Sequence, residues 1–331
     1  MTNLPRVIVA DFVPEPLECE RYILNGHAQV VALNLKHQEE LDGQLDDADA
    51  VMIYHYLRLT RAHIERLKHC KVIVRPGVGY DNIDIAAARE RNIPVCNVPD
   101  YGTEEVADSV IGMAITLARG THFLNSRLRR GIGNWNVEQA APIHRLRGRV
   151  FGIVGCGQIG AATALRAKSF GFDVVIYDPP LRDGVDKSLG VRRVDSLEEL
   201  LQQSDVISLH CPLTPETRGM IGATQLAQMR RGTVLVNTAR GGVVDTAAVV
   251  EALASGHLMG AGIDVLEQEP PPEDSPVLRA WRDTSHPAHD RLLLNPHTAY
   301  YSEEGSNEFR TKGSQEVLRA LHDQPLRNRV N

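Results

Sequence analysis

The sequence predicts an α/β protein with two doubly wound, parallel-sheet domains. Its 331 residues are enough for two domains, because single domains cluster at ~100–150 residues. Short β-branched runs alternate with amphipathic stretches through the first hundred residues, and the same rhythm returns in the second half. Short apolar runs separated by helical patterns are typical of βαβ units, in which the strands are parallel.

The first half contains five such runs and two clear helical stretches. The expected strands are RVIVADF (6–12), AQVVALNL (28–35), AVMIYHY (50–56), KVIVRPG (71–77) and PVCNVP (94–99). The expected helices are TRAHIERLKHC (60–70) and IDIAAARERN (83–92). In the second half the expected strands are RVFGIVG (149–155), DVVIYD (173–178), DVISLH (205–210), TVLVN (233–237), GAGID (260–264) and LLLN (292–295).

A long apolar helix is expected between the two halves, over residues 103–131. Thr103 opens it, and Glu104 and Glu105 follow in the first turn, where acidic side chains suit the helix dipole. Its apolar positions cover more than one face: Val106, Ala107, Val110, Ile111, Ala114, Leu117 and Ala118. A helix that is apolar so far round is buried, either within the chain or against a second subunit.

Composition excludes several classes of function. No apolar run approaches the ~20 residues that cross a bilayer, and the N-terminus lacks a signal-peptide pattern, so we expect a cytoplasmic protein without a membrane partner. The five cysteines form no C-x-x-C pair, so neither a disulfide framework nor a zinc site is indicated. A formal net charge of −6 gives no basic footprint for nucleic acid, and a small-molecule partner is favoured.

The sharpest single motif is G-x-G-x-x-G, formed by Gly155, Gly157 and Gly160 between an apolar run and a helix that Gly171 ends. The first glycine permits a tight turn, the second admits a pyrophosphate, and the third lets helix and strand pack closely. Asp178 lies eighteen positions after Gly160, where a carboxylate accepts hydrogen bonds from the adenosine ribose. The motif therefore predicts a Rossmann domain that binds NAD rather than NADP, although the nearby Arg182 could bind a phosphate.

Three further residues follow predicted strands at the edge of the sheet where ligands bind in open α/β folds: Arg240, Glu269 and His297. Taken singly, they read as a surface cation, a solvated loop acid and a loop histidine. Together they suit the reduction of a 2-keto acid. An imidazole can give a proton to the developing alkoxide, a carboxylate beside it favours and orients the imidazolium, and a guanidinium can hold the substrate carboxylate.

These segments resemble the D-isomer-specific 2-hydroxyacid dehydrogenase family over about residues 7–322. The similarity is greatest to the C-terminal-binding protein branch, through VCNVPDYGTEEVADS, ALRAKSFGFDVVIYDPPLRDGV, LVNTARGGVVD and PHTAYYSEE. The resemblance implies catalytic roles for Arg240, Glu269 and His297. It implies cofactor contacts at Gly155, Gly157, Gln158, Ile159, Gly160, Asp178, Cys211, Pro212, Thr217, Thr238, Ala239 and Asp264.

The resemblance also implies a discontinuous domain organisation. A flavodoxin-like substrate domain would comprise residues 1–102 and 300–331, and a Rossmann NAD-binding domain residues 103–299. The hinges would lie near Tyr101–Thr103 and Ala299–Tyr300. Substrate contacts are implied at Arg75, Gly77, Val78, Gly79 and Tyr300. The helix from Thr103 matches the family's dimer element and so predicts a homodimer.

Three departures from the branch bear on the substrate. Tyr300 stands where the C-terminal-binding proteins have tryptophan, and Val78 replaces a serine. The segment WRDTSHPAHDR (281–291) is longer than expected, and its His286 and His289 have H-x-x-H spacing, which fits either a metal site or, as we expect, a solvated loop without metal.

The function expected from these observations is an NAD-dependent D-2-hydroxyacid dehydrogenase, acting as a 2-keto acid reductase. The alternatives are an NADH-sensing scaffold like the corepressors of the C-terminal-binding branch and a 3-phosphoglycerate dehydrogenase. No arginine cluster for a substrate phosphate is evident, which favours keto acids with small or medium apolar side chains.

Overall fold

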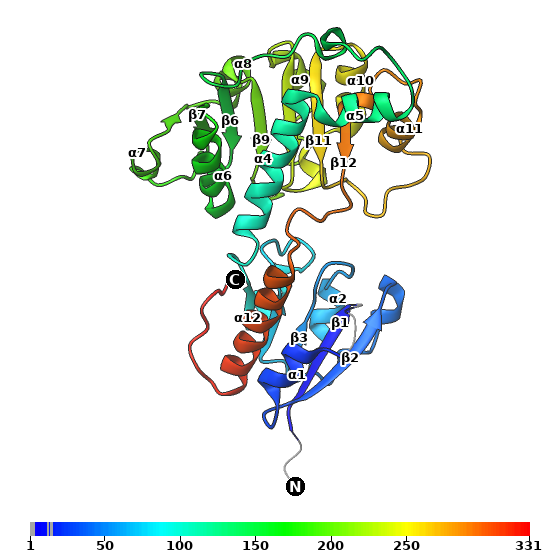
Figure 1. Cartoon of the computed structure of the whole chain (residues 1–331). Helices are drawn as coiled ribbons and strands as arrows, with labels where there is room; N and C mark the ends of the chain where they lie inside the picture. Colours follow the sequence, from blue (N-terminus) through cyan, green and yellow to red (C-terminus); the bar gives the residue numbers. More distant parts are fainter. Residues whose placement is uncertain (1–3, 12, 14–15) are drawn as a thin grey trace. The chain divides into compact units, whose positions relative to one another are not determined.

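The computed structural model describes residues 4–11, 13 and 16–331 and divides into two compact units (Figure 1). Unit 1 comprises Met1–Gly102 and Ser302–Asn331, and unit 2 comprises Thr103–Tyr301. The first boundary lies where the sequence places it, and the second lies two residues later. Tyr300 therefore belongs to unit 2 and not to the substrate domain to which the sequence analysis assigned it.

Unit 1 is built on a sheet whose five strands all run parallel. Their spatial order is β2 (Gln29–Leu35), β1 (Arg6–Asp11), β3 (Ala50–Met52), β4 (Val72–Arg75) and β5 (Val95–Asn97). The order 2-1-3-4-5 is that of flavodoxin-like folds, as expected. The run 50–56 is a strand only to Met52, and its polar end forms a loop.

Helices cover both faces of this sheet. On one face α1 (Glu18–Leu24) and α12 (Glu303–Leu321) pack on a core that includes Val7, Val9 and Val317. On the other face α2 (Arg61–Arg66), α3 (Ile85–Glu90) and the 3₁₀ turn η1 (Gln38–Leu41) cover a second core, which includes Ile8 and Ile73.

Helix α12 returns the chain to unit 1 and begins where the sequence predicts. The Ser302 hydroxyl caps it by accepting a hydrogen bond from the Gly305 N–H at 2.8 Å. Arg310 donates to both oxygens of the fully buried Glu20, at 2.8 and 2.7 Å. Burial raises the pKa of Glu20, but the bonds from Arg310 and Tyr54 outweigh it and leave that pKa lowered. This ion pair ties the last helix to the first.

Unit 2 contains a seven-stranded sheet in which every pair is again parallel. The spatial order is β12 (Leu292–Leu294), β11 (Leu258–Ile263), β10 (Thr233–Asn237), β9 (Val206–Leu209), β6 (Val150–Val154), β7 (Asp173–Tyr177) and β8 (Arg192–Arg193). This is the Rossmann order extended by one strand, with the switch point between β6 and β9. Strand β8 was not expected from the sequence.

Two layers of helices enclose the sheet of unit 2. Helices α4 (Thr103–Arg119) and α6 (Gln158–Ser169) pack on one core. Helices α8 (Leu197–Gln203), α9 (Ala223–Gln228), α10 (Thr246–Ala254) and α11 (Pro276–Arg282) pack on the other, and the short α7 (Val185–Leu189) precedes β8. Three 3₁₀ turns complete the described elements of unit 2: η2 (Val137–Ala140), η3 (Gly241–Val243) and η4 (His289–Arg291).

The apolar excess of α4 is satisfied within unit 2. Val110 and Ala114 are fully buried, and Met113 lies so close to β11 that a Cβ on Gly262 would be 3.0 Å from it. Of the two readings that the sequence left open for this helix, burial within the chain is the one observed. The packing of α4 therefore needs no second subunit.

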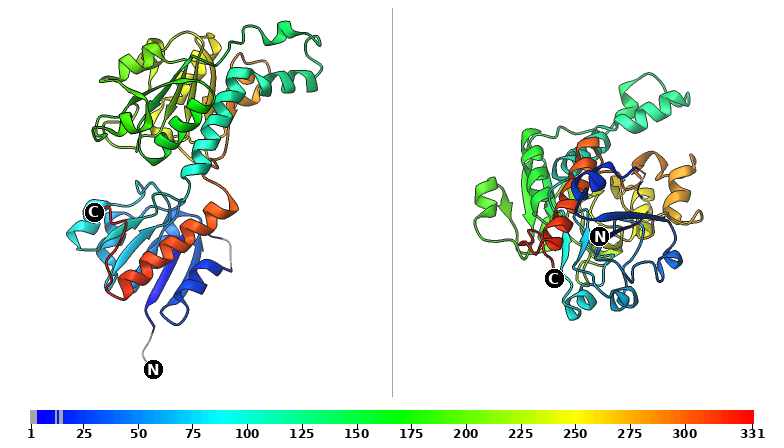
Figure 2. Two further views of the ribbon diagram at one scale, coloured as in Figure 1. Left: turned by 60° about the vertical axis from the view of Figure 1, so that its left-hand side comes forward. Right: turned by 90° about the horizontal axis from the view of Figure 1, so that it is seen from below.

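The helix expected over residues 103–131 is broken. Gly120 has a left-handed backbone, with φ of 65°, and α5 (Thr121–Arg129) begins there in a new direction with no buried side chain. The segment that follows exposes 92% of Trp135 and 81% of Val137. Figure 2 shows α5 and this segment projecting from unit 2. We call residues 121–145 the arm.

The arm is anchored by the unusually long segment 281–291. Asp290 accepts a hydrogen bond from Arg130 at 2.8 Å, and its carbonyl lies 2.8 Å from Nε2 of His122. His289 Nδ1 lies 2.6 Å from the Trp281 carbonyl, and His286 Nδ1 accepts from the Ala288 N–H at 3.1 Å. Both histidines of the H-x-x-H pair thus bond to the backbone of their own loop.

Within residues 4–11, 13 and 16–331, no helix combines the length and the apolar character that a membrane crossing needs.

Candidate active site

The glycine motif forms a tight turn between β6 and α6, and each glycine has a separate reason to lack a side chain. Gly155 has φ of 88°, and a Cβ on it would lie 2.9 Å from the Cys211 nitrogen at the end of β9. A Cβ on Gly160 would lie 2.1 Å from the Gly155 carbonyl oxygen. Around Gly157, by contrast, a Cβ would meet nothing within 4 Å. The turn is therefore closed on the protein side and open where a phosphate can approach.

Helix α6 presents its N-terminus at this opening. Gly157 is its N-cap and has no side chain to accept from the first N–H groups, and Gln158 and Ile159 form the first turn. A helix N-terminus with unsatisfied N–H groups attracts anions. These residues fit a dinucleotide pyrophosphate.

Asp178 follows β7 and lies beside the same turn. Its Oδ2 accepts a hydrogen bond from the Cys156 N–H at 2.7 Å. Burial raises the pKa of the Cys156 thiol to about 11, so this cysteine stays protonated at neutral pH. The Asp178 carboxylate is thus fixed to the glycine turn and keeps further acceptor capacity for ribose hydroxyls.

The loop after β9 is closed by Thr217. Its hydroxyl donates to the Pro212 carbonyl at 2.6 Å and accepts from the Thr214 N–H at 2.8 Å. Burial raises the pKa of Cys211 to about 11, so its thiol is protonated as well. The loop therefore has a fixed shape next to Gly155, and its Cys211 side chain is an uncharged thiol.

A second polar turn follows β10. The Asn237 side chain spans it by accepting from the Ala239 N–H and donating to the Arg240 carbonyl, both at 3.0 Å. The Thr238 hydroxyl is buried, and it has no hydrogen-bond partner among the residues that the structure describes. A buried hydroxyl in this state fits a contact to a bound cofactor.

The loops that carry Arg240 and Glu269 pack backbone to backbone. A Cβ on Gly241 would lie 1.9 Å from the Leu266 carbonyl carbon, so only glycine fits after Arg240. The Leu266 N–H donates to Oε1 of Glu269 at 2.8 Å, and Arg240 Nη1 donates to the Ala239 carbonyl at 2.8 Å. Each of the two side chains is thus bonded to the backbone of its own loop.

His297 completes the group in unit 2. Its Nδ1 lies 2.7 Å from Oε2 of Glu269. The residue has φ of 54°, a conformation that histidine adopts more readily than most residues, and its N–H donates to the Asp264 carbonyl at 2.8 Å. The Tyr300 ring stands edge-on to the imidazole, with ring centres 6.1 Å apart.

Asp264 is a buried anchor for the His297 loop. Its carboxylate is only 2% exposed and accepts from the backbone N–H groups of Thr298 and Ala299, at 2.9 and 3.1 Å. Burial raises the pKa of Asp264, although those two hydrogen bonds oppose the shift. The ring of His297 is therefore held by Glu269 and its backbone by Asp264.

The remaining predicted contacts lie in unit 1, at the end of β4. The Arg75 side chain folds back over Gly77. It lies so close that a Cβ on Gly77 would be 1.3 Å from Arg75 Nη1. The Gly77 carbonyl accepts from the Val98 N–H at 3.0 Å, and that of Val78 accepts from the Asn97 amide at 2.7 Å. Arg75, Gly77, Val78 and Gly79 thus form one loop at the carboxyl edge of the unit 1 sheet.

Two functional candidates were missed by the sequence analysis. Glu267 accepts from the N–H and the hydroxyl of Thr246, each at 3.0 Å, and so ties the Glu269 loop to the start of α10. Arg193, on β8, bonds to the loop after Asp178. Glu267 resembled the exposed acids around it, and the Arg-Arg pair of β8 has no strand pattern.

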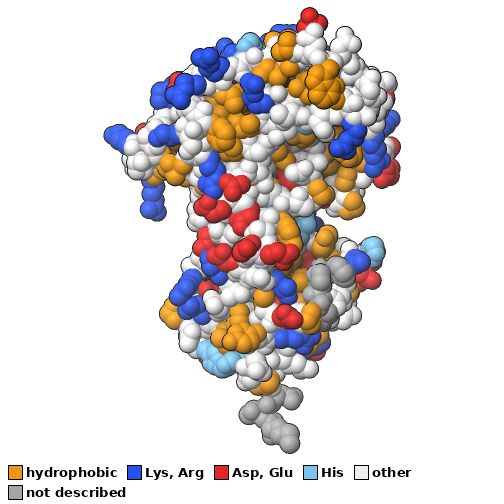
Figure 3. Space-filling view, viewed as in Figure 1, with side chains coloured by type: hydrophobic (Ala, Val, Ile, Leu, Met, Phe, Trp, Pro, Cys, Tyr) orange, Lys and Arg blue, Asp and Glu red, His pale blue; other side chains and the backbone are white. Residues whose placement is uncertain are grey.

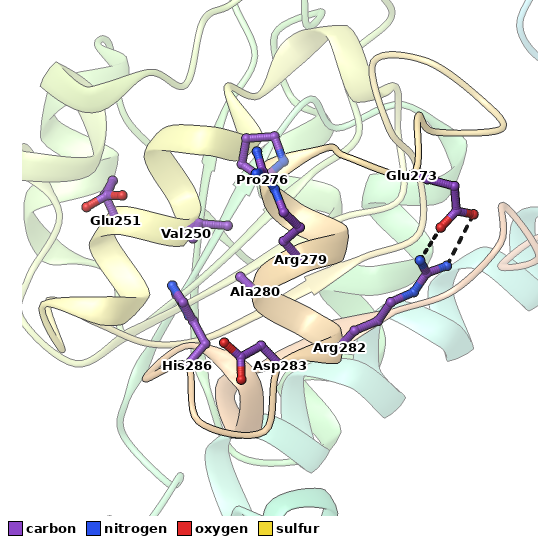
Figure 4. A pocket seen from close by; sticks show the side chains of 9 residues that line it. All are labelled: Val250, Glu251, Glu273, Pro276, Arg279, Ala280, Arg282, Asp283 and His286. Atoms are coloured by element: carbon purple, nitrogen blue, oxygen red, sulfur yellow. Dashed lines mark hydrogen bonds and ion pairs between the residues drawn. The ribbon is translucent and has the colours of Figure 1, made fainter.

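A separate hollow of about 590 Å³ lies between α10 and α11 (Figure 4). Val250 and Ala280 contribute apolar surface to it, the Arg282–Glu273 ion pair lies at its edge, and His286 and Asp283 border it. None of the predicted catalytic or cofactor residues lines it. On the face of unit 2 seen in Figure 3, basic side chains are interspersed with uncharged and apolar ones.

Comparison with known proteins agrees with this geometry. Residues 111–299 match the model of the D-isomer specific 2-hydroxyacid dehydrogenase NAD-binding domain. The chain belongs to the D-isomer-specific 2-hydroxyacid dehydrogenase family. Its cofactor is NAD, and the match lies wholly within unit 2.

Individual members of the family are similar over most of the chain. The D-3-phosphoglycerate dehydrogenase of Methanocaldococcus jannaschii is 37% identical over 89% of this chain and 54% of its own length. C-terminal-binding protein 1 of Caenorhabditis elegans is 35% identical over 96% of this chain and 43% of its own length. The chain thus spans about half the length of these curated relatives. A glyoxylate reductase from Paecilomyes thermophila is 30% identical, with a TM-score of 0.85 over 100% of this chain and 99% of that one.

Proposed function

We propose that the protein is an NAD-dependent oxidoreductase that interconverts a 2-keto acid and a D-2-hydroxy acid. The observation that carries the proposal is the 2.7 Å contact between His297 Nδ1 and Glu269 Oε2, with the Glu269 loop packed against that of Arg240. An imidazole held by a carboxylate, next to a guanidinium, suits proton transfer to a carbonyl oxygen on a carboxylate-bearing substrate.

The cofactor would supply a hydride to the substrate C2 as NADH and would accept one from it as NAD⁺. The residues that would hold it are Gly155–Gly160, Asp178, Cys211, Pro212, Thr217, Thr238, Ala239 and Asp264. Gly157 leaves room for the pyrophosphate, and the Thr238 hydroxyl offers a buried hydrogen-bonding group.

In the reductive direction His297 is the general acid. Glu269 accepts from Nδ1–H and so orients the ring, and Nε2 is the nitrogen that gives a proton to the developing alkoxide. In the oxidative direction the same nitrogen takes the hydroxyl proton.

Arg240 binds the substrate carboxylate and polarises the keto oxygen. Arg75, Gly77, Val78 and Gly79 are further proposed substrate contacts, and Tyr300 forms an aromatic wall beside His297. No arginine cluster for a substrate phosphate is evident in the sequence, which favours a small or medium apolar side chain on the keto acid. Within the family we propose a C-terminal-binding protein-like branch, which the similarity to C-terminal-binding protein 1 supports.

Two alternatives are supported by particular relatives. The similarity to C-terminal-binding protein 1 supports an NADH-sensing scaffold, and that to D-3-phosphoglycerate dehydrogenase supports a phosphorylated substrate. The test is NADH oxidation by the purified protein with glyoxylate, hydroxypyruvate, 4-methylthio-2-oxobutyrate and 3-phosphohydroxypyruvate. Turnover of an unphosphorylated acid supports the proposal, preference for the phosphorylated acid supports the second alternative, and no turnover with retained NADH binding supports the scaffold.

We also propose that the protein is a homodimer. Because the apolar side chains of α4 are covered within unit 2, the surface that suits a second copy is the arm, with Trp135 and Val137 exposed. Figure 3 shows apolar side chains among the exposed groups of unit 2. Exposed apolar patches of this kind mark interaction sites.

A further inference from the structure

We propose that Arg193 is a positioning residue of the cofactor site, which holds the segment Asp178–Asp183 in the shape that binds the adenosine ribose of NAD and excludes a 2′-phosphate. The inference rests on the proposed role of Asp178. Arg193 belongs to no sequence motif. It reaches the loop after Asp178 from β8, the strand that neighbours β7.

Arg193 makes an unusual set of contacts with one short loop. Its Nη1 donates to the Leu181 carbonyl at 3.1 Å and lies 3.5 Å from an Asp183 oxygen. Its Nη2 donates to the carbonyls of Asp178 and Pro179, both at 3.2 Å. A guanidinium presents several donors in a fixed plane, so one side chain can fix several carbonyls at once.

Asp178 is consequently held at two points. Its carboxylate accepts from the Cys156 N–H of the glycine turn, at 2.7 Å, and its carbonyl accepts from Arg193. The Leu181 N–H also donates to that carbonyl, at 3.1 Å. The carboxylate that would receive the ribose hydroxyls is therefore fixed relative to the pyrophosphate turn before any cofactor arrives, which reduces the ordering cost of binding.

Strand β8 owes its significance to this contact. It is only two residues long and pairs with β7 through Val175–Arg192 and Ile176–Arg193. Side chains of successive strand residues point to opposite faces, so the two arginines diverge. Arg192 donates to the Gln203 side chain on α8 at 2.8 Å, whereas Arg193 reaches the loop after β7. The chain therefore provides a matched control one residue away.

The same contacts discriminate against NADP. A 2′-phosphate carries roughly two negative charges, so a site that binds NADP needs a cationic side chain that points toward that phosphate. The Arg193 donors are engaged with loop carbonyls, and turning the guanidinium outward would release the loop. With Asp178 fixed nearby, the phosphate would meet a carboxylate instead.

The test is a direct titration of the full-length protein with NADH and with NADPH, in which the fluorescence of the bound nucleotide is measured. For Arg193→Gln we expect the Kd for NADH to rise about tenfold, because hydrogen bonds from a charged group are lost. We expect the Kd for NADPH to change less, so that the preference for NADH narrows. Arg193→Lys should recover part of the loss, and Arg192→Gln should stay within about twofold of the wild type. The kcat at saturating NADH should be unchanged in the control variant Arg192→Gln.

The outcomes separate this inference from the proposed function. Equal NADH affinity in Arg193→Gln and Arg192→Gln would overturn the role of Arg193 and leave the proposed function intact. The same holds if Arg193→Gln loses affinity for NADH and for NADPH by the same factor. If Arg193→Gln fails to fold, Arg193→Lys decides the matter, because a wild-type NADH preference in that variant also overturns it. A wild-type protein that binds no NADH would overturn the proposed function and this inference together.

Discussion

At the residue scale, hydrogen bonds from side chains and from the backbone hold the main groups of the candidate site. His297 is held at its ring by Glu269 and at its backbone by Asp264, and Asp178 is held by the Cys156 N–H. Preorganised groups of this kind reduce the cost of adopting a reactive geometry. The site thus combines side chains that the sequence makes visible with anchors that it does not.

His210 offers a test of the environment beside the glycine turn. Burial lowers its pKa to about 4, from an ordinary value of ~6.5, and its Nε2 lies 2.9 Å from the Ser208 hydroxyl. A folded-state pKa below the unfolded value gives stability that is complete above pH ~6.5 and is lost as pH falls toward 4. We therefore expect the free energy of unfolding of the wild type to fall by up to about 1.4 kcal/mol per pH unit from this group.

His210→Gln should remove that loss, so its urea midpoint should change less than that of the wild type between pH 7 and pH 5. The control is His144→Gln, which alters an exposed histidine of unit 2. Parallel pH profiles for the wild type and His210→Gln would contradict the buried, neutral state of His210.

At the residue scale, sequence reasoning reaches the residues whose chemistry is concentrated in motifs. Gly155–Gly160, Arg240, Glu269 and His297 could be proposed because their types and spacing suit one reaction. Glu267 and Arg193 could not, because their partners, Thr246 and the carbonyls after Asp178, are set by loop packing. From sequence alone, a charged residue with charged neighbours is expected to be exposed to solvent, and only the tertiary contacts show otherwise.

At the element scale, the parallel sheets followed from apolar runs, and exceptions arose where packing overrode the pattern. β8 consists of two arginines and is a strand only because β7 pairs with it. The helix expected over 103–131 ends early because Gly120 takes a left-handed backbone. Segment 281–291 was expected to be solvated, yet its Asp290 anchors the arm.

For the glycine turn we expect two similar substitutions to affect different properties, one the binding of NADH and the other the stability of the fold. Gly157→Ala adds a Cβ that meets nothing within 4 Å, so the melting temperature should be unchanged while the Kd for NADH rises about tenfold or more. Gly160→Ala adds a Cβ 2.1 Å from the Gly155 carbonyl oxygen, so it should cost about 1–3 kcal/mol of stability.

Calorimetry and NADH titration of both variants would check this contrast. Wild-type NADH affinity in Gly157→Ala would show that no phosphate approaches there, and a wild-type melting temperature in Gly160→Ala would show that the turn is not closely packed.

At the scale of the whole molecule, the chain is two α/β units joined at two crossings, and strand order alone assigns each unit to a fold class. The order of the unit 1 sheet could be predicted only through the family resemblance, because apolar runs reveal strands but not their neighbours. The position of the second crossing was predicted within two residues. Side-chain contacts of Tyr300, including that with His297, place it in unit 2.

The proposed homodimer makes a prediction at this scale. Replacing Trp135 and Val137 by serine should shift the protein toward the monomer in sedimentation velocity, because it removes exposed apolar surface from the arm. Tyr22→Ser is the control, since Tyr22 is 85% exposed on unit 1. A double variant that remains as dimeric as the wild type would place the interface elsewhere.

The central claim is that His297, held by Glu269, transfers the proton in NADH-dependent reduction of a 2-keto acid. The most direct measurement compares kcat for NADH oxidation in the wild type and His297→Gln on the best acid of the panel, with NADH affinity measured in parallel. We expect kcat to fall about 10²–10⁴-fold while the Kd for NADH stays unchanged. A variant that retains kcat within a few-fold of the wild type would contradict the account.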